Sequence, residues 1–302
     1  MSCYACALLK STKCSKHVGG KASQTLKVIW PSTPQVPRVT EYAKSIARAA
    51  IRRGEFGPPS PLVVEQAQKE SAMSVDSNAT FDAILSVFCT EVTLAAQHAH
   101  IRGVSREKLN LTVPFNESAI LKAAETIRQP PVALLRYLLL AEGATPSQVR
   151  NAMADPKSLS RLLTGSFTRL FRADLASRLN SMRAHDMASE FEDRISEMLA
   201  TQIGRSAFLR ENDARAASKE SGLTPDFLFT KPIIINGQPV HWLDAKNYYW
   251  YGSPLTARSV ISQAEKYTKA FGPGAFAFRY GADPTTKILS KNDTKAPQIL
   301  TL

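Results

Sequence analysis

Two short motifs near the C-terminal end carry the residue types that hydrolysis of a phosphodiester requires. Thr224-Pro225-Asp226 and Asp244-Ala245-Lys246 each lie next to an apolar run of strand type. Magnesium prefers carboxylate, water and substrate oxygens, and a bound divalent ion stabilises the transition state and lowers the pKa of its water. A lysine beside two carboxylates can neutralise a phosphate or orient the attacking water. The motifs therefore indicate metal-dependent cleavage of a phosphodiester.

A plainer interpretation exists, because a pattern this short also arises by chance. Asp226 would then cap a turn after Pro225, and Asp244 and Lys246 would form a surface ion pair. The residues before Asp244, Val240-His241-Trp242-Leu243, are strongly apolar, so the charges emerge from a buried strand. Buried charges need a partner or a purpose, which favours a functional site.

The surrounding pattern predicts how these residues are positioned. Strands are expected at 206–209, 227–229, 233–235, 240–243 and 275–280, with Asn236-Gly237 as a tight hairpin turn and a helix over 256–271. If the strand at Asp226 pairs with the strand that ends at Asp244, both carboxylates reach one rim of the sheet. Lys246 lies two residues further on and therefore points to the same face.

A helix that opens near His185 and runs to about Thr201 is expected to precede these strands. Its buried face would contain Phe191, Ile195, Met198 and Leu199. Glu192 follows Phe191 directly, so it could reach the edge of a neighbouring site. The predicted order of the C-terminal region is helix, three strands, helix, strand.

The middle of the chain has a helical pattern. Helices are expected over 41–53 and about 80–100, from Asn116 to Ile127, from Pro131, from Thr145-Pro146 and over 157–182. Three short helices with tight breaks resemble a helix-turn-helix arrangement that could contact nucleic acid; scaffolding or partner binding is the open alternative. The candidate phosphate contacts are all arginines: Arg128, Arg136, Arg150, Arg161, Arg169 and Arg172.

The positive charge is concentrated in the first part of the chain. The net charge is +12; residues 1–184 hold 24 Lys and Arg against 13 Asp and Glu, whereas residues 185–302 hold 14 against 13. A basic region beside a nearly neutral, carboxylate-bearing one fits a module that holds a polyanion and another that cuts it. A basic tail with ordinary solvated helices would give the same totals.

The N-terminal residues predict little regular structure. Residues 1–40 contain no acidic residue and are expected to form a disordered leader that ends in a Pro-rich linker over 30–37. The acid-free leader resembles an organelle-targeting peptide. Cys3, Cys6, Cys14 and His17 have zinc-ligand spacing, although incidental cysteines in a tail are the favoured interpretation. No apolar run approaches the roughly 20 residues that span a bilayer, so a membrane protein is not predicted.

Five segments together resemble the TPD-motif proteins of the PD-(D/E)xK, or restriction-endonuclease-like, superfamily. The resemblance is clear over residues 185–281 and looser over 116–183. The matching segments are Leu223-Thr224-Pro225-Asp226, His241-Trp242-Leu243-Asp244-Ala245-Lys246, Gln263-Ala264-Glu265-Lys266-Tyr267, Phe271-Gly272-Pro273-Gly274 and Arg279-Tyr280-Gly281. The family's acid-x-Lys acid is expected to be Glu in its animal members, whereas this chain has Asp244.

The resemblance implies an α/β fold and assigns roles by position. Residues 185–302 would form a restriction-endonuclease-like core of order αβββαβ, after an all-α, helix-turn-helix-like domain over 41–184. Asp226, Asp244 and Glu192 would be metal ligands for Mg²⁺ or Mn²⁺. Lys246 would be the catalytic lysine, and Gln263 and Tyr267 would complete the site.

The resemblance also implies partners and a location. The expected substrate is DNA, branched or otherwise structured, with RNA as an open alternative. A codanin-like protein is an expected partner, and the nucleus and cytoplasm are the expected compartments. The alternative from another functional class is a weak or inactive nuclease fold that serves as a binding module for nucleic acid or for the codanin-like partner.

Overall fold

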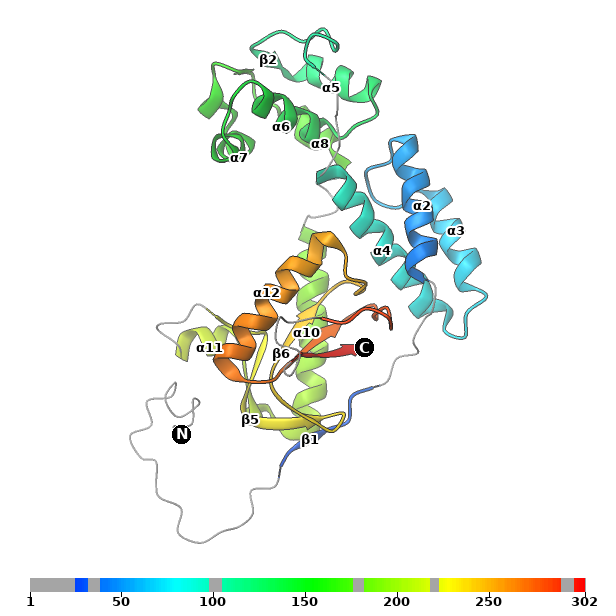
Figure 1. Ribbon diagram of the computed structural model, residues 1–302, viewed down its shortest axis with the longest axis vertical. Helices are drawn as coiled ribbons and strands as arrows, with labels where there is room; N and C mark the ends of the chain where they lie inside the picture. The colour runs from blue at the N-terminus through cyan, green and yellow to red at the C-terminus, as the bar shows by residue number, and fades with distance from the viewer. Residues whose placement is uncertain are drawn as a thin grey trace. The chain divides into compact units, whose positions relative to one another are not determined.

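The computed structural model (Figure 1) describes residues 25–31, 39–97, 105–175, 182–217, 223–288 and 296–301. The chain divides into two units, which are treated separately below. The sheet unit consists of residues 1–39 and 183–302, and the helical unit consists of residues 40–182. The sheet unit therefore uses segments from before and after the helical unit.

A mixed, six-stranded sheet forms the centre of the sheet unit. The strands are β1 (Lys27–Val28), β4 (Phe208–Arg210), β5 (Phe227–Ile235), β6 (Gln238–Lys246), β7 (Ala275–Phe278) and β8 (Gln298–Thr301). The order is β1-β5-β6-β7-β8, and β4 also pairs with β5. The pairs β4–β5 and β5–β6 are antiparallel, whereas β1–β5, β6–β7 and β7–β8 are parallel. The predicted α/β class with a mixed sheet is confirmed.

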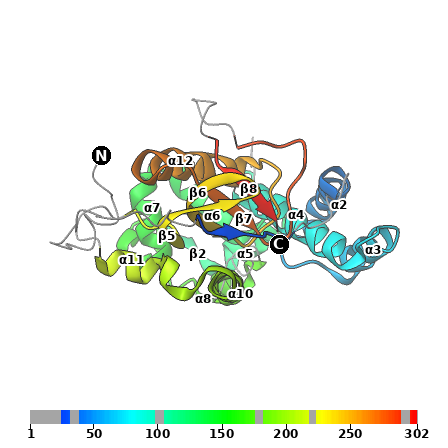
Figure 2. The same cartoon turned by 90° about the horizontal axis from the view of Figure 1, so that it is seen from below.

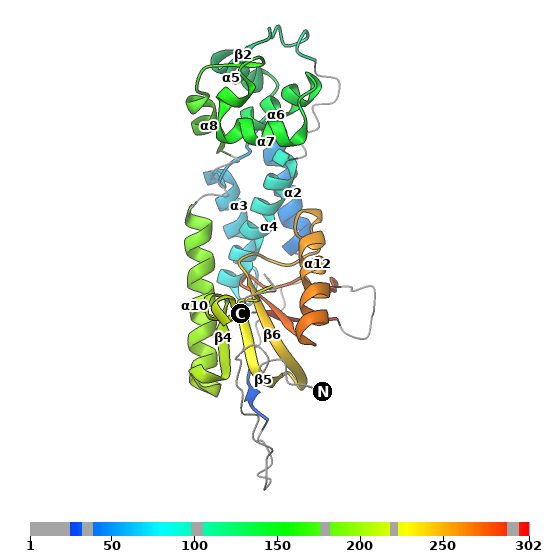
Figure 3. The same ribbon diagram turned by 90° about the vertical axis from the view of Figure 1, so that its left-hand side faces the viewer.

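Helices cover both faces of this sheet, as Figure 3 shows for α10 (Met182–Ile203) and α12 (Pro254–Phe271). Alternate residues of each strand point to opposite faces, and the core is accordingly split into two clusters. Phe191, Ile195 and Leu199 of α10 pack on one face, while Val260, Ala264 and Tyr267 of α12 pack on the other. The remaining helical elements are the short η2 (Arg205–Ala207) and α11 (Glu211–Ala217).

The hairpin of β5 and β6 is close to its prediction. Asn236 and Gly237 form the turn with φ values of 49° and 78°, the left-handed conformation that this dipeptide adopts readily. The two expected segments 227–229 and 233–235 are one strand whose register shifts between Leu228 and Ile233. Pro232 lies in this interval and has no N–H to donate, so an interruption of the ladder is expected there.

Three strand predictions need correction. The strand from Ala275 ends at Phe278 and is not the last, because β8 follows it. Residues 27–31 are expected to be leader and linker, but Lys27 and Val28 form β1 and pair with Ile234 and Ile235. Neither β1 nor β8 has a sequence signal of its own, since a strand of two to four residues is defined by its partner.

The two ends of the sheet order, β1 and β8, approach each other because the sheet curls (Figure 2). The indole N–H of Trp30 donates a 2.9 Å hydrogen bond to the carbonyl of Thr301. Trp30 is 6% exposed, and Val28 is also buried. The extended segment after β1 is thus part of the core of the sheet unit.

Most helices of the helical unit lie at predicted positions with small boundary shifts, but the helix over Pro61–Ser71 was not predicted. The helices are α2 (Val39–Arg53), α3 (Pro61–Ser71), α4 (Ser77–Gln97), α5 (Glu117–Thr126), α6 (Pro131–Ala141), α7 (Pro146–Ala154) and α8 (Thr168–Ala173). Asn116 caps α5 by accepting the N–H of Ala119, and Thr145 with Gln148 forms a capping box on α7. The core of this region includes the fully buried leucines Leu134, Leu135, Leu138 and Leu139.

The continuous helix predicted over 157–182 is wrong within the residues that are described. A short 3₁₀ turn, η1 (Pro156–Leu159), is followed by β3 (Leu163–Thr164), which pairs in parallel with β2 (Phe115–Asn116). Gly165 has a φ of 101°, and Phe167 has a φ of 56°. Backbone in this region cannot continue a right-handed helix, so α8 starts afresh at Thr168.

Helix α4 corrects the expectation that no long apolar run exists. Within the described ranges it is the one helix that is long and apolar enough, over Ser77–Ala96, to cross a membrane by length and composition. A core helix passes the same test, and Ala83, Ile84 and Val87 are fully buried. The candidate zinc ligands Cys3, Cys6, Cys14 and His17 lie outside the described residues.

Candidate functional site

The strand register brings the two motif carboxylates together at one rim of the sheet, which we call the acid rim. Phe227 of β5 pairs with Leu243 of β6 in an antiparallel ladder. Asp226 and Asp244 occupy the next position of each strand and therefore face each other. Asp226 lies two residues from Leu228 and Asp244 two residues from Trp242, so each points to the same face of the sheet as that neighbour. Leu228 and Trp242 pack in the hydrophobic cluster under α12. The acid rim thus opens on the α12 face of the sheet.

Asp244 is buried and Asp226 is half-buried, and this removal from water affects their protonation. Burial and, after it, the nearby charge of Asp244 together raise the pKa of Asp226 to about 8, although a hydrogen bond from the Ala245 N–H opposes the shift. That bond joins the Ala245 nitrogen to Asp226 Oδ2 at 2.6 Å. Burial also raises the pKa of Asp244, which is 3% exposed, against the lowering effect of Lys246. The acid rim therefore has too little positive charge to keep both carboxylates ionised at their usual pKa.

Lys246 supplies the cation of the site. Its ammonium contacts Asp244 Oδ2, and its side chain is 16% exposed. The ammonium also lies 5.6 Å from the centre of the Phe276 ring, within the range of a cation–π interaction. Lys246 is therefore held between a carboxylate and an aromatic ring, whereas an ordinary surface lysine would be free to reorient.

Glu192 reaches the same rim from α10. Burial raises its pKa, Arg210 lowers it, and the charges of Glu211 and Asp244 raise it. The guanidinium of Arg210, at the end of β4, lies 3.6 Å from Glu192 and 2.5 Å from Asp193. The expected third carboxylate is thus near Asp244 but is already paired with an arginine.

The α12 residues Gln263 and Tyr267 lie one turn apart. Tyr267 is buried; its hydroxyl donates to the carbonyl of Thr224 at 3.3 Å, and its ring packs edge-on against Trp242. Burial and the charges of Asp244 and Asp226 raise the pKa of Tyr267. Gln263 is half-buried. Tyr267 therefore ties α12 to the Thr-Pro-Asp turn.

Two residues of the rim were missed by the sequence analysis. Glu211, the first residue of α11, accepts a 3.2 Å hydrogen bond from the Thr224 hydroxyl, and its charge raises the pKa of Asp244. The pKa of Tyr248 is raised by burial and by the charge of Asp244. Glu211 follows the expected strand at 206–209 and could have been found as a third acid at a strand end. Tyr248 carries no such signal.

The donor set fits a hard cation in an open site. Within the described ranges, no group of three or more His, Cys, Asp or Glu side chains is close enough to form a complete metal cage. Two facing carboxylates supply oxygen ligands and excess negative charge, which suits Mg²⁺ or Mn²⁺ with water or substrate completing the coordination. Asp226 and Asp244 would hold such an ion.

The six arginines predicted to contact nucleic acid all belong to the helical unit and are exposed. Arg136 lies on α6, Arg150 on α7 and Arg161 after η1. Arg169 is engaged within the unit, because its guanidinium donates to Glu117 at 2.8 Å and to the Ser118 hydroxyl at 2.7 Å. Arg169 is therefore at least partly structural.

Comparison with known proteins supports the resemblance. Residues 168–295 match the family described as "Protein of unknown function TPD sequence-motif". The chain is 51% identical over 69 residues to an uncharacterized protein of Acanthamoeba polyphaga mimivirus. This match covers 22% of the chain and 25% of that protein. No solved structure matches the chain.

More distant relatives have a functional name. CDAN1-interacting nuclease 1 of Bos taurus is 25% identical over 155 residues, 50% of this chain and 53% of that protein. The human protein of the same name is 28% identical over 98 residues, 32% of this chain and 33% of that protein. Depending on the relative, the match thus covers between a quarter and about half of the relative's own length. The predicted resemblance to the TPD-motif proteins is confirmed. The TPD sequence-motif family matches residues 168–295, and the similarity to a named nuclease is distant.

Proposed function

We propose that the chain is a metal-dependent nuclease whose acid rim hydrolyses phosphodiester bonds in DNA. The observation that carries the proposal is the register of β5 and β6, which sets Asp226 opposite Asp244 with Lys246 on the same face. The distant similarity to a protein named as a nuclease supports the reaction class. DNA is the proposed substrate because the helical unit presents exposed arginines to a polyanion.

Each side chain has a defined task in this proposal. Asp226 and Asp244 would hold the divalent ion, which would neutralise negative charge and lower the pKa of its bound water. Lys246 donates a proton to, or neutralises, a phosphate oxygen from its position against Asp244. Tyr267 acts as a positioning residue, because its hydroxyl fixes the carbonyl of Thr224, two residues before Asp226. Burial of the rim strengthens each of these electrostatic interactions.

The test is cleavage of labelled linear, flap and four-way DNA, and of RNA, with Mg²⁺ or Mn²⁺ and with EDTA. Asp244→Asn should abolish metal-dependent cleavage while the protein remains folded. Asp213→Asn is the matched control, since Asp213 is half-exposed and pairs with Arg205 away from the acid rim. Equal cleavage by wild type and Asp244→Asn, or no cleavage of any substrate, would contradict the proposal.

A second candidate function is binding to a partner protein. It rests on the name of the relatives in cattle and humans, which describes an interaction with CDAN1. A CDAN1-like protein is therefore a proposed partner, with or without nuclease activity. Binding of such a protein by the Asp244→Asn variant, together with absence of cleavage by wild type, would favour this candidate.

A further inference from the structure

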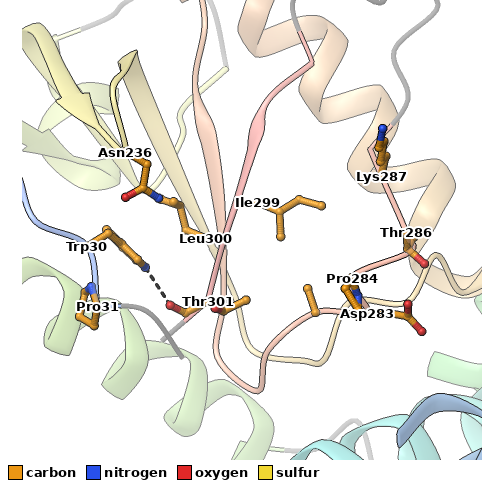
Figure 4. Close-up of a pocket in the computed structure, with 11 residues that line it drawn as sticks. Trp30, Pro31, Asn236, Asp283, Pro284, Thr286, Lys287, Ile299, Leu300 and Thr301 are labelled. Atoms are coloured by element: carbon orange, nitrogen blue, oxygen red, sulfur yellow. Dashed lines mark hydrogen bonds between the residues drawn. The ribbon is translucent and has the colours of Figure 1, made fainter. Parts of the chain in front are cut away.

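A pocket of about 360 Å³ lies along β8, on the side where the two ends of the sheet approach each other. Figure 4 shows Trp30 and Asn236 on one side of the pocket, Ile299 in the middle, and Asp283, Pro284 and Lys287 on the other side. None of these residues belongs to the acid rim. The lining is about equally polar and apolar, with charges at Asp283 and Lys287.

The backbone of β8 is paired on one edge only. Gln298 donates its N–H to the carbonyl of Gly274 at 3.0 Å, in register with β7. Residues of a parallel strand alternate in the edge to which their N–H and C=O point, so Gln298 and Leu300 face β7. Ile299 and Thr301 therefore turn these groups to the outer edge, which agrees with the bond from Trp30 to the Thr301 carbonyl. Within the described ranges, the N–H and C=O of Ile299 have no partner.

At the other end of the sheet, next to β1, the outward-facing backbone groups are paired by a side chain of this chain. The side-chain amide of Gln202 accepts from the Ile29 N–H at 2.9 Å and donates to the Ile29 carbonyl at 3.1 Å. One amide side chain thus satisfies both groups as a neighbouring strand would. No described side chain does this for Ile299, although unpaired strand edges are strong templates for pairing.

We propose that the outer edge of β8 binds an extended peptide segment of a partner protein as an added strand. The peptide backbone would pair with the N–H and C=O of Ile299, and one peptide side chain would enter the pocket between Trp30 and Pro284. A single strand is the occupant that fits, because the pocket is walled on both sides.

The test starts from a displayed library of linear 12-residue peptides, selected on the wild-type protein and counter-selected on Ile299→Pro. Proline removes the outward N–H but no bond to β7, and it is tolerated on edge strands. Synthetic versions of the enriched peptides should bind wild type and bind Ile299→Pro about tenfold or more weakly, as expected for loss of a backbone hydrogen bond in a partly buried site. Thermal melting controls for folding of the variant.

A second measurement does not depend on any protein variant. N-methylation of the bound peptide at alternate positions removes its amide donors, one set facing β8 and the other facing away. The first set should abolish binding, and the second should leave it largely unchanged. Peptide binding should also slow hydrogen exchange at residues 296–301 without affecting cleavage of DNA.

Three outcomes would overturn the proposal. The first is that no peptide is enriched on wild type over Ile299→Pro. The second is that both N-methylated sets bind equally well. The third is a concentration-dependent dimer that Ile299→Pro dissociates, because the occupant would then be a second copy of this chain.

Discussion

The sheet unit and the helical unit differ in where they keep their charges. The sheet unit sets the half-buried Asp226 against the buried Asp244, and both have raised pKa values. The helical unit keeps the six candidate arginines exposed, and its carboxylate Glu117 has a lowered pKa, because hydrogen bonds from Arg169 and Leu170 outweigh the effect of burial. One unit gives up stability to concentrate charge, as functional sites do, while the other uses charge to hold its helices together.

The largest expected effect concerns how tightly the sheet unit is packed below the acid rim. A Cβ at Gly274 would overlap the ring of Trp242, which is fully buried and donates to the carbonyl of Gly272. We expect Gly274→Ala to lower the free energy of unfolding by about 3 kcal/mol or more, measured by urea denaturation.

The control for this change lies in the helical unit. A Cβ at Gly143 would meet no atom within 4 Å, but this residue has a φ of 84°. Gly143→Ala should therefore cost only about 1 kcal/mol through backbone strain. Equal losses for the two variants would show that the Trp242 ring can move aside.

Removal of one carboxylate should have opposite effects in the two units. Asp226→Asn keeps an acceptor for the Ala245 N–H and relieves repulsion by Asp244, so we expect a gain of about 1 kcal/mol at pH 8. Glu117→Gln weakens bonds from Arg169 and the Leu170 N–H, so a loss of about 1 to 2 kcal/mol is expected. Hydrogen exchange reads each unit separately; a loss of protection around β6 in Asp226→Asn would contradict the comparison.

The pH dependence should also differ in sign. Asp226 binds its proton more tightly in the folded state, with a pKa of about 8, against about 3.9 in an unfolded chain. Its contribution to stability is therefore present below about pH 4 and is lost as the pH rises to about 8. Glu117 has a lowered pKa, so its contribution is lost as the pH falls below about 4.3.

This difference can be measured by hydrogen exchange from pH 4 to 8.5 in EDTA. Protection of β6 should fall with rising pH in wild type, and the slope should flatten in Asp226→Asn. Protection of α5 should be constant over the same range. A flat profile for β6 in wild type would show that the surroundings of Asp226 do not raise its pKa.

The smallest effect concerns single arginines on the surface. If the helical unit holds DNA, Arg150→Ala should weaken binding about threefold and reduce the slope of log affinity against log salt by about one. Arg194→Ala, an exposed arginine of α10 in the sheet unit, is the charge-matched control and should leave the slope unchanged. Equal effects of both variants would remove the distinction between a unit that holds and a unit that cuts.

Sequence reasoning succeeded where a signal is local. Asn116, Thr145 and Asn236-Gly237 fix their caps and turn through neighbours only a few residues away. The alternation of apolar residues in β5 and β6 was also sufficient to predict that Asp226 and Asp244 meet. These features depend on short-range physics, so they survive without knowledge of the fold.

Three of the missed features depend on distant partners. β1 has two residues and exists because β5 offers an edge. β3 interrupts a helical pattern because Leu163 pairs with Phe115. Glu211 enters the acid rim because β4 delivers α11 beside Thr224. In each case the pairing partner, and not the segment itself, determines the structure.

The bond between Trp30 and Thr301 joins residues 271 positions apart, and this separation constrains the order of events during synthesis. A ribosome adds about 5 to 20 residues per second, so Trp30 waits many seconds before Thr301 leaves the exit tunnel. During that interval the helical unit can fold around its own core, and β1 can pair with β5 once residue 235 has been made, but β8 is still missing. The hydrogen bond from Trp30 to Thr301 can therefore form only after the other strands of the sheet have been made, and until then the indole N–H of Trp30 lacks this acceptor.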